Sequence, residues 1–396
     1  MIKNFIISSF GTLIAQIILF LALPQIAKVW GSDDFGIYSH DVSIGIIIAT
    51  VLILRLELLI MNDDSNKAKS YFFGVIKLCF LSCIICMVIL FNFSLDRYIL
   101  PLYYGCSLIL YNSAILYLSV DRYFFKISLA RIVTNLLFVC FAFFMPKDMG
   151  IIFYHFIATL ITFLFLYCFA LKDKNLSYHV KFSKVIHDGK GYILNTFPAS
   201  ICNVSCINII PVVIPFLFNE SKAGVFFLAY KTIIFPVGIV GQSLGNILRR
   251  ELLANYHDKK ERNRVFIYVS LIIFLICLSF YFLVLQFYEM VFLNYFSSEW
   301  SDVLSIYGSL LYLSIIMMIY APLGHVFLCS GNQKTDLIFN FLKAIMLTTF
   351  LIVSYINMYD FITFVNYYAV VMGTAYFIGV LLVLHCFFIR IEDEQL

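Results

Sequence analysis

Apolar stretches of 18 or more residues recur along the whole chain and alternate with short polar segments. Each stretch is long enough to cross about 30 Å of hydrocarbon as an α-helix. The pattern predicts an all-α polytopic membrane protein with about twelve transmembrane helices. Their approximate positions are residues 5–28, 36–60, 72–91, 98–118, 127–145, 150–171, 191–218, 222–249, 265–287, 303–328, 335–357 and 361–388.

The composition supports the same class. Of the 396 residues, 62% are hydrophobic and 13% are charged. Soluble domains carry about 25% charged residues, so this chain has too few polar side chains to cover a surface that faces water.

Lysine and arginine are concentrated in every second connection between the predicted helices. Cytoplasmic loops are enriched in these residues, which predicts that both termini are cytoplasmic. One set of connections holds Lys3, Lys67, Lys69, Arg122, Lys126, Lys172, Lys174, Lys181, Lys184, Lys190, Arg249, Arg250, Lys259, Lys260, Arg262, Arg264, Lys334 and Arg390, whereas the other holds only Lys28, Arg97, Lys147 and Lys222.

A polar segment divides the chain into halves and predicts two six-helix bundles around a central cavity. The predicted parts are an N-terminal bundle at 1–171, a cytoplasmic linker at 172–190 and a C-terminal bundle at 191–396. The stretch LPQIAKVWGSDDFGIYS at 23–39 faintly resembles VIPFLFNESKAGVFFLAYK at 213–231, since each has a proline, a polar acidic turn and a helix that starts with glycine and an aromatic residue. Internal repeats of this kind build the central site of many carriers, which favours a carrier over a pore.

Other functional classes find little support. The basic run NYHDKKERNRV at 255–265 is interpreted as a cytoplasmic retention signal beside anionic lipid, so we predict no nucleic-acid partner. The eleven cysteines, including CIIC at 83–86 and CNVSC at 202–206, lack a second cluster at metal-ligand spacing, which predicts neither a metal site nor a disulfide framework. The outward connections are short and the chain has no G-x-x-x-x-G-K-[ST] motif, so we predict a transporter with no catalytic residues and no cofactor.

Three motifs near the N-terminus carry a family resemblance: GTLIAQIILFLALP at 11–24, DFGIYS at 34–39 and RLELLIM at 55–61. With the twelve-helix layout, they resemble the Wzx-type polysaccharide exporters of the multidrug/oligosaccharidyl-lipid/polysaccharide superfamily. The resemblance implies a flippase that moves undecaprenyl-diphosphate-linked oligosaccharides, such as O-antigen repeat units, to the outer leaflet of the bacterial inner membrane. His40 and Asp41, in YSHDVSIG, depart from the less charged pattern of such relatives.

The predicted helices contain more embedded cations than acids. A Lys or Arg at the helix centre costs about 2.5 to 3.5 kcal/mol on the insertion scale, so such residues usually face a wet cavity or a partner. A cationic interior suits an anionic lipid diphosphate, for which Lys and Arg are natural ligands. The predicted cavity cations are Arg55, Lys77, Arg131, Lys231 and Lys343, and the embedded acids are Asp41 and Glu57.

The charges of the second predicted helix have more than one interpretation. On a helix over 36–60, Arg55 and Glu57 point about 160° apart and do not pair directly. Arg55 shares a face with Asp41 and Gly45, and it is either a phosphate ligand or an interfacial anchor. Glu57 is expected to hold a neighbouring helix. Asp41 is a candidate residue for coupling to H+, Na+ or the membrane potential.

The eighth predicted helix carries a stripe of small and polar residues. Lys231, Gly238, Gln242, Gly245 and Arg249 fall close to one line at 100° per residue. The stripe is either a seam for close helix packing or a path for an anionic head group. We favour the path, because packing alone does not explain a Lys, a Gln and an Arg on the same line.

Histidines are expected to be packed or interfacial residues rather than proton relays; those near span ends are His155, His325 and His385.

Two functions remain after these considerations. The leading one is a lipid-linked oligosaccharide flippase working by alternating access, with membrane lipid and other polysaccharide-assembly proteins as further partners. The alternative is an ion-coupled exporter of drugs or other small molecules from the same superfamily. Drug exporters are expected to place carboxylates deep inside to bind organic cations, whereas this chain shows mostly the reverse.

Reporter fusions test the predicted orientation. Fusions after Lys184 and after Lys260 should give a cytoplasmic signal, and a fusion after Glu299 an external one, because basic residues are retained on the cytoplasmic side. An external signal at Lys260 would contradict the predicted helix count.

Overall fold

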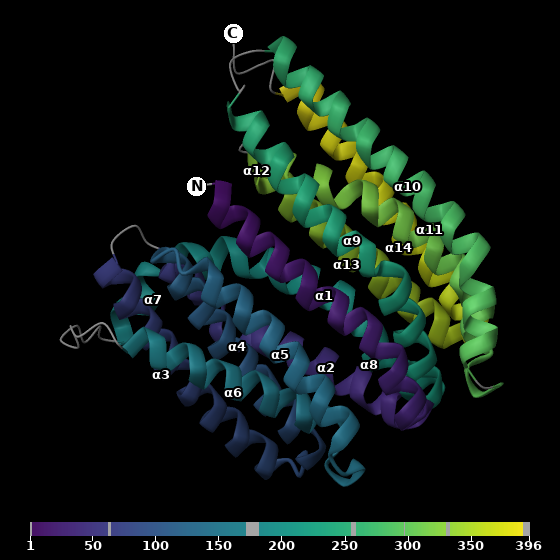
Figure 1. The fold of residues 1–396 in the computed structure, drawn as a ribbon, viewed down its shortest axis with the longest axis horizontal. Coiled ribbons are helices and arrows are strands. Elements are labelled where there is room, and N and C mark those ends of the chain that lie inside the picture. The colour runs from purple at the N-terminus through teal and green to yellow at the C-terminus, as the bar shows by residue number, and fades with distance from the viewer. Residues whose placement is uncertain are drawn as a thin grey trace. The chain divides into compact units, whose positions relative to one another are not determined.

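A computed structural model describes residues 2–61, 65–171, 182–254, 259–296, 298–329 and 333–390. Every regular element in these ranges is a helix (Figure 1). Twelve of the described helices are long and apolar enough to cross a membrane. The predicted all-α polytopic fold is therefore confirmed.

Contacts between Cα atoms group the chain into two compact units, residues 1–224 and 225–396. The first unit contains α1 (Ile2–Trp30), α2 (Ser32–Ile53), η1 (Leu56–Ile60), α3 (Ser65–Asn92), η2 (Asp96–Tyr98), α4 (Ile99–Val120), α5 (Phe124–Phe144), η3 (Lys147–Met149), α6 (Ile151–Leu171), α7 (Phe182–Asp188), η4 (Tyr192–Thr196) and α8 (Phe197–Leu217).

The second unit holds the remaining helices, and α9 begins a few residues before it. They are α9 (Glu220–Ala254), α10 (Lys259–Tyr295), η5 (Ser298–Trp300), α11 (Asp302–Leu323), α12 (Val326–Cys329), α13 (Gln333–Asn357), α14 (Phe361–His385) and η6 (Cys386–Arg390). The predicted division on either side of residues 172–190 stays a prediction. Contacts join α8 to α2 within the first unit.

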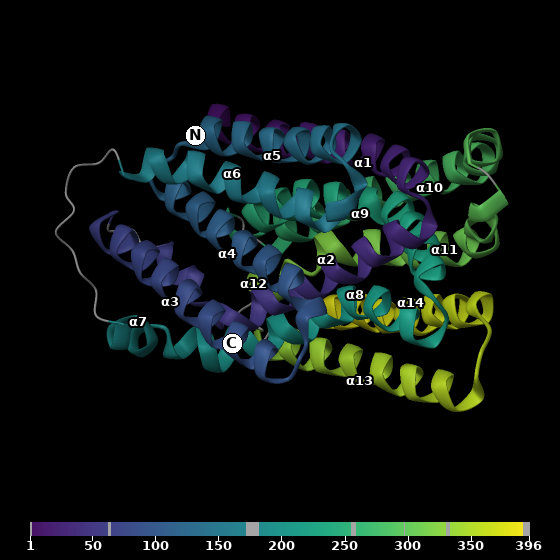
Figure 2. The ribbon, with the colours of Figure 1, turned by 90° about the horizontal axis from the view of Figure 1, so that it is seen from below.

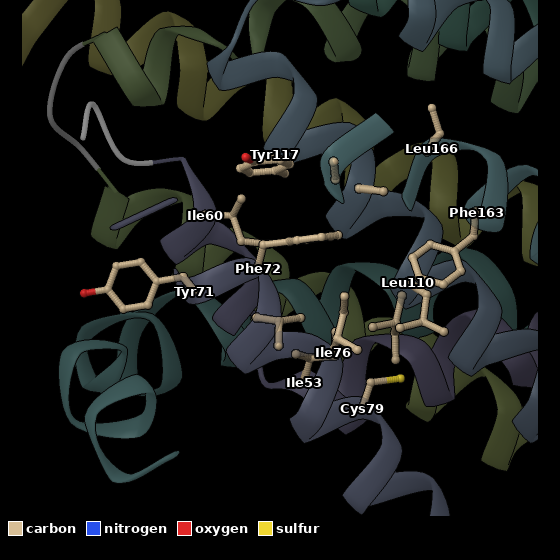
Figure 3. Packing of buried hydrophobic residues seen from close by; sticks show 14 of the residues in the cluster. Ile53, Ile60, Tyr71, Phe72, Ile76, Cys79, Leu110, Tyr117, Phe163 and Leu166 are labelled. Atoms are coloured by element: carbon tan, nitrogen blue, oxygen red, sulfur yellow. The ribbon is translucent and has the colours of Figure 1, made fainter. Parts of the chain in front are cut away.

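The core of the first unit forms around α4, which packs against α2, α3 and α6. Figure 3 shows the buried cluster that joins these helices to η1. Its centre is a stacked ring pair, Phe72 of α3 and Tyr117 of α4, with ring centroids 5.0 Å apart. On the other side of this unit, α1 and α5 run side by side (Figure 2).

In the second unit, α11 and α14 pack against each other, with α10 beside α11 and α13 beside α14 (Figure 1). The hydroxyl of Ser314 on α11 donates to the carbonyl oxygen of Ile233 on α9 at 3.0 Å. Phe226 of α9 meets Tyr368 of α14 edge to face. These contacts hold α9 against both central helices.

Several predicted boundaries differ from the structure. The helix predicted at 36–60 ends at Ile53, because Leu54 and Arg55 adopt positive φ angles of 52° and 63°, a left-handed conformation that an α-helix cannot contain. The predicted connection at 249–264 is partly helical, since α9 reaches Ala254 and α10 begins at Lys259. Helices continue there beyond the apolar stretch because charged side chains can remain in water.

The predicted linker 172–190 contains a short helix, α7, although residues 172–181 lie outside the described ranges. Tyr71 of α3 donates to the Asp188 carboxylate at the end of α7, at 2.7 Å. This bond is the main reason that the pKa of Asp188 lies below its ordinary value. A Cβ atom on Gly189 would overlap the side chain of Leu56, so the end of α7 lies tightly on η1.

Glycines allow α2 and α4 to approach each other closely. A Cβ atom on Gly105 would lie 2.7 Å from the carbonyl oxygen of Gly45, and one on Gly45 would lie 3.0 Å from that of Pro101. Small residues of this kind let helix backbones come together in membranes, where apolar surface gives no advantage over lipid.

A larger residue at this crossing should separate the two helices. We expect Gly105→Leu to lower the melting temperature of the purified protein by roughly 1 to 4 °C, because overpacking costs about 1 to 3 kcal/mol and the chain has 396 residues. Gly308→Leu is the matched control, since Gly308 on α11 is exposed and no atom lies within 4 Å of its Cβ position. Equal melting temperatures for both variants would show that the crossing tolerates a side chain.

Candidate functional site

A cavity of about 210 Å³ lies within the first unit, between α1, α4, α5 and α6. Helix α1 contributes Thr12, Ala15 and Gln16, α4 contributes Leu108 and Tyr111, α5 contributes Arg131, Thr134 and Asn135, and α6 contributes His155 and Thr159. These residues point inward because α1, α4 and α6 each contact α5. The packed bundle thus collects polar side chains from four separate apolar helices.

Arg131 is the cation of this cavity. Its side chain donates a hydrogen bond to the hydroxyl of Thr12 on α1. One turn along α5, the Asn135 amide donates to the carbonyl oxygen of Ala15 at 2.6 Å. Since Arg131 has further guanidinium N–H groups than the one that meets Thr12, it can bind an anion without breaking that contact.

His155 stands at another wall of the cavity, where both ring nitrogens have partners. Nδ1 lies 3.0 Å from the hydroxyl of Tyr38, and Nε2 lies 3.5 Å from that of Tyr104. The imidazole also stacks on Phe138, with centroids 4.4 Å apart. Two hydroxyls and an aromatic face therefore fix the ring orientation, which agrees with the expectation of a packed histidine.

The lining has a clear electrostatic character. Of the ten lining residues, Arg131 is always charged and none is an aspartate or glutamate. Hydroxyl and amide groups of Thr12, Gln16 and Asn135 complete a set of hydrogen-bonding groups around the guanidinium. This arrangement suits a phosphate or a sugar hydroxyl, and it offers no counter-charge to an organic cation.

The positions of Arg55 and Glu57 differ from those predicted for the second helix. Arg55 donates to the Glu57 carboxylate at 3.0 Å, so the prediction that the two cannot pair is wrong. They meet because the chain leaves the helix after Ile53 and turns through the left-handed residues into η1. Burial raises the pKa of Glu57, while the neighbouring guanidinium acts in the opposite direction.

Two other predicted cations lie apart from the cavity. Lys77 is exposed on α3. Lys343 of α13 is only 1% exposed, lies 3.2 Å from the Asn340 side-chain oxygen and stands over the rings of Phe339 and Tyr376. In this conformation Lys343 is enclosed by its own unit.

The predicted stripe on α9 has a mixed environment. Lys231 stands over the ring of Phe227, with 5.1 Å between Nζ and the ring centroid, and Gly238 borders open space. Gly245 packs closely, since a Cβ atom there would lie 2.5 Å from the ring of His325. Arg249 is exposed, and the side chain of Gln242 lies outside the described residues. Packing therefore explains part of the stripe, and its role as a path stays a prediction.

Asp41 is buried in the middle of α2, where its carboxylate lies 2.9 Å from His40 Nδ1. It does not line the cavity with Arg131. The role of Asp41 in coupling stays a prediction.

Sequence reasoning identified Arg131 but missed the polar residues that surround it. Gln16 lies within one of the quoted motifs, and Asn135 follows Arg131 by four residues, so the two α5 residues share a helix face. That spacing was a usable signal. No sequence pattern joins Thr12 to Arg131, because 119 positions separate them.

The sequence matches no protein-family model and no curated protein. The fold has relatives among solved structures. The lipid II flippase MurJ, in an inward closed conformation, is 13% identical with a TM-score of 0.73, and the match covers 96% of this chain and 87% of MurJ.

Two further matches are transporters of the MOP superfamily. An inward-facing multidrug resistance MATE family transporter is 15% identical with a TM-score of 0.65, over 99% of this chain and 95% of its own. A transporter from Pyrococcus furiosus, described as having a binding pocket of reverse polarity, is 14% identical with a TM-score of 0.57, over 100% of this chain and 96% of its own. The chain thus has the fold of a lipid flippase and of MATE transporters, along nearly its whole length.

Proposed function

We propose that this protein is a flippase that translocates undecaprenyl-diphosphate-linked oligosaccharide across the bacterial inner membrane by alternating access. The observation that carries the proposal is the cavity around Arg131, which has a cation and neutral hydrogen-bonding groups but no carboxylate in its described lining. We expect both termini in the cytoplasm and other polysaccharide-assembly proteins as neighbours.

The cavity chemistry fits the polar part of such a substrate. A diphosphate is a double anion that Arg can bind through two parallel N–H groups. Hydroxyl and amide side chains such as Thr12, Gln16 and Asn135 can exchange hydrogen bonds with phosphate oxygens or sugar hydroxyls. A substrate whose tail stays in lipid needs the protein to enclose only its head group.

The cavity volume favours a partial enclosure of this kind. Pockets for drug-sized ligands measure about 300 to 1,000 Å³, whereas this cavity measures about 210 Å³. It can hold a phosphate or part of a sugar, and it is small for a whole drug molecule.

The alternative function is an ion-coupled exporter of small molecules, and the MATE fold supports it as well. An organic cation needs a buried carboxylate or aromatic faces for its charge. The Arg131 guanidinium would repel such a ligand, so we rank this alternative second. The narrower Wzx-type assignment rests on the three N-terminal motifs.

Arg131 variants test the proposal. In proteoliposomes that carry a fluorescent undecaprenyl-diphosphate sugar, we expect Arg131→Ala to slow translocation by about tenfold to 100-fold, since a charged hydrogen bond contributes about 1.5 to 3 kcal/mol. Arg131→Lys should retain part of the rate because its positive charge survives. Arg264→Ala is the matched control, because Arg264 is a highly exposed arginine that pairs with Glu261.

The outcome separates the two functions. No translocation of the labelled lipid by the wild-type protein, together with uptake of an organic cation, would refute the flippase and support the exporter. A wild-type rate for well-inserted Arg131→Ala would remove this cavity from the substrate path.

Lys231 provides a second test, at a predicted site residue in the other unit. We expect Lys231→Ala to abolish surface glycan while the protein inserts at a near-normal level, and Lys231→Arg to keep partial display because the charge remains. Lys260→Ala is the control, since this lysine is exposed near the start of α10. Normal glycan on cells with Lys231→Ala would reduce the α9 stripe to a packing seam.

A further inference from the structure

The segments that resemble each other in sequence also meet in space, through residues 32–36 and 220–224. A Cβ atom on Gly36 would overlap the carbonyl oxygen of Glu220, and one on Gly224 would overlap that of Ser32. Each glycine therefore opposes the residue four positions before the other glycine, which is the pattern of a two-fold crossing. The hydroxyl oxygens of Ser32 and Ser221 lie 2.6 Å apart. We call this contact between α2 and the first turn of α9 the glycine seam.

A buried histidine lies directly beside the glycine seam. His40 follows Gly36 by four residues and so lies one turn further along the same face of α2. Its side chain is fully buried. Nδ1 lies 2.9 Å from the Asp41 carboxylate, and Nε2 has no hydrogen-bond partner among the described residues.

The rings around His40 come from two segments that also approach the seam. Phe216 of α8 packs edge-on at 5.8 Å between centroids, and Tyr98 of η2 lies at 6.5 Å. The residue before Tyr98 is Arg97, whose guanidinium lies 3.7 Å from the Glu220 carboxylate. The imidazole therefore lies next to the glycine seam, where the Ser32–Ser221 hydroxyl pair and the Arg97–Glu220 ion pair add further contacts.

Few other charges face this site. Helices α4 and α8, which pack on α2, contain no Asp, Glu, Lys, Arg or His. Helix α6 brings only His155, which is bonded to Tyr38 and Tyr104. The basic residues of α1, Lys3 and Lys28, lie at its two ends. Helix α3 has Lys67 and Lys69 in its first two turns and the exposed Lys77 further along. Among the described residues, the other charged groups on the elements around His40 are Asp33, Asp34 and Asp41 of α2, Asp96 and Arg97 of η2, and Glu220 and Lys222 in the first turn of α9, and the titratable Tyr98 of η2 lies beside them.

We propose that His40 and Asp41 form a proton-binding site that controls the glycine seam. In the closed seam, a neutral imidazole donates its Nδ1–H to Asp41 and leaves Nε2 as a bare acceptor. A proton from the outer aqueous phase adds an N–H at Nε2, which has no acceptor in this apolar enclosure. A buried donor without an acceptor is costly, so the proton binds better when the seam separates and water reaches the ring.

The linkage has a definite direction. A proton that binds the separated form better shifts the population toward that form, and loss of the proton favours closure. Histidine is suited to this because its charge changes most readily between about pH 5 and 8. The role in transport rests on the proposed function: an acidic outer phase would open the predicted outer side of the carrier.

Cross-linking tests the site without any substrate. Cysteines in a Ser32→Cys/Ser221→Cys variant lie within reach of a disulfide when the seam is closed. A reference pair, Ser309→Cys/Asn366→Cys, joins α11 and α14, where the side-chain oxygens are also 2.6 Å apart. The cross-linking rate of the seam pair, divided by that of the reference pair, should fall about tenfold from about pH 8 to about pH 5.5. This decrease corresponds to a proton affinity that is about tenfold higher in the separated form than in the closed form. The reference pair corrects for the thiolate fraction.

Variants of His40 and Asp41 test whether these two residues cause the pH dependence. In the seam-pair background, His40→Gln and Asp41→Asn should each reduce the pH dependence, whereas His187→Gln, at an exposed histidine, should leave it unchanged. Single-cysteine variants exclude disulfides to native cysteines. A rate ratio that does not change with pH in the native background would overturn the proposal, whether or not the dyad variants fold. A pH-dependent seam in a protein that moves no lipid would instead refute only the proposed function.

Discussion

Hydrocarbon offers the peptide backbone no hydrogen-bond partner, and this constraint decides the architecture. Every segment that crosses the bilayer must satisfy its own N–H and C=O groups, so each becomes a helix. Polar side chains follow the same requirement: the hydroxyl of Thr134 donates to the carbonyl oxygen of Ala130 at 2.8 Å, and that of Thr162 to Ala158 at 2.8 Å. Irregular backbone occurs at Leu54 and Arg55, where the charged residues Arg55 and Glu57 interrupt an apolar run.

Because of the same constraint, the contacts of an embedded cation indicate its role better than its presence in the sequence does. Lys343 has an amide oxygen and two aromatic faces for its charge, and the almost fully buried Arg262 lies over the ring of Phe387. These contacts offset the cost of burial within one bundle. Arg131 instead combines a hydroxyl partner with an open volume. Its guanidinium lines this cavity, which is why the proposed function depends on it.

Repetition in the sequence has a physical consequence at the glycine seam. Two segments with similar turns can oppose each other symmetrically, and a glycine on each lets the backbones touch. Beside that contact, the rings of Phe216 and Tyr98 pack near His40, whose Nε2 is buried. In the proposed switch, closing the backbone contact and removing solvent from the imidazole are one structural event.

The sequence by itself determined the helical class and the apolar spans, because both depend on local composition and on the thickness of the bilayer. It also indicated Arg131, since an embedded guanidinium needs a polar partner. Periodicity failed at Arg55 and Glu57, where two left-handed residues end the helix and bring the charges together. Only the tertiary structure decided which helices supply the cavity, which glycines meet and that the Nε2 of His40 is enclosed without a partner. These features depend on contacts between residues more than a hundred positions apart, such as Arg131 with Thr12, and helical periodicity extends only along one helix.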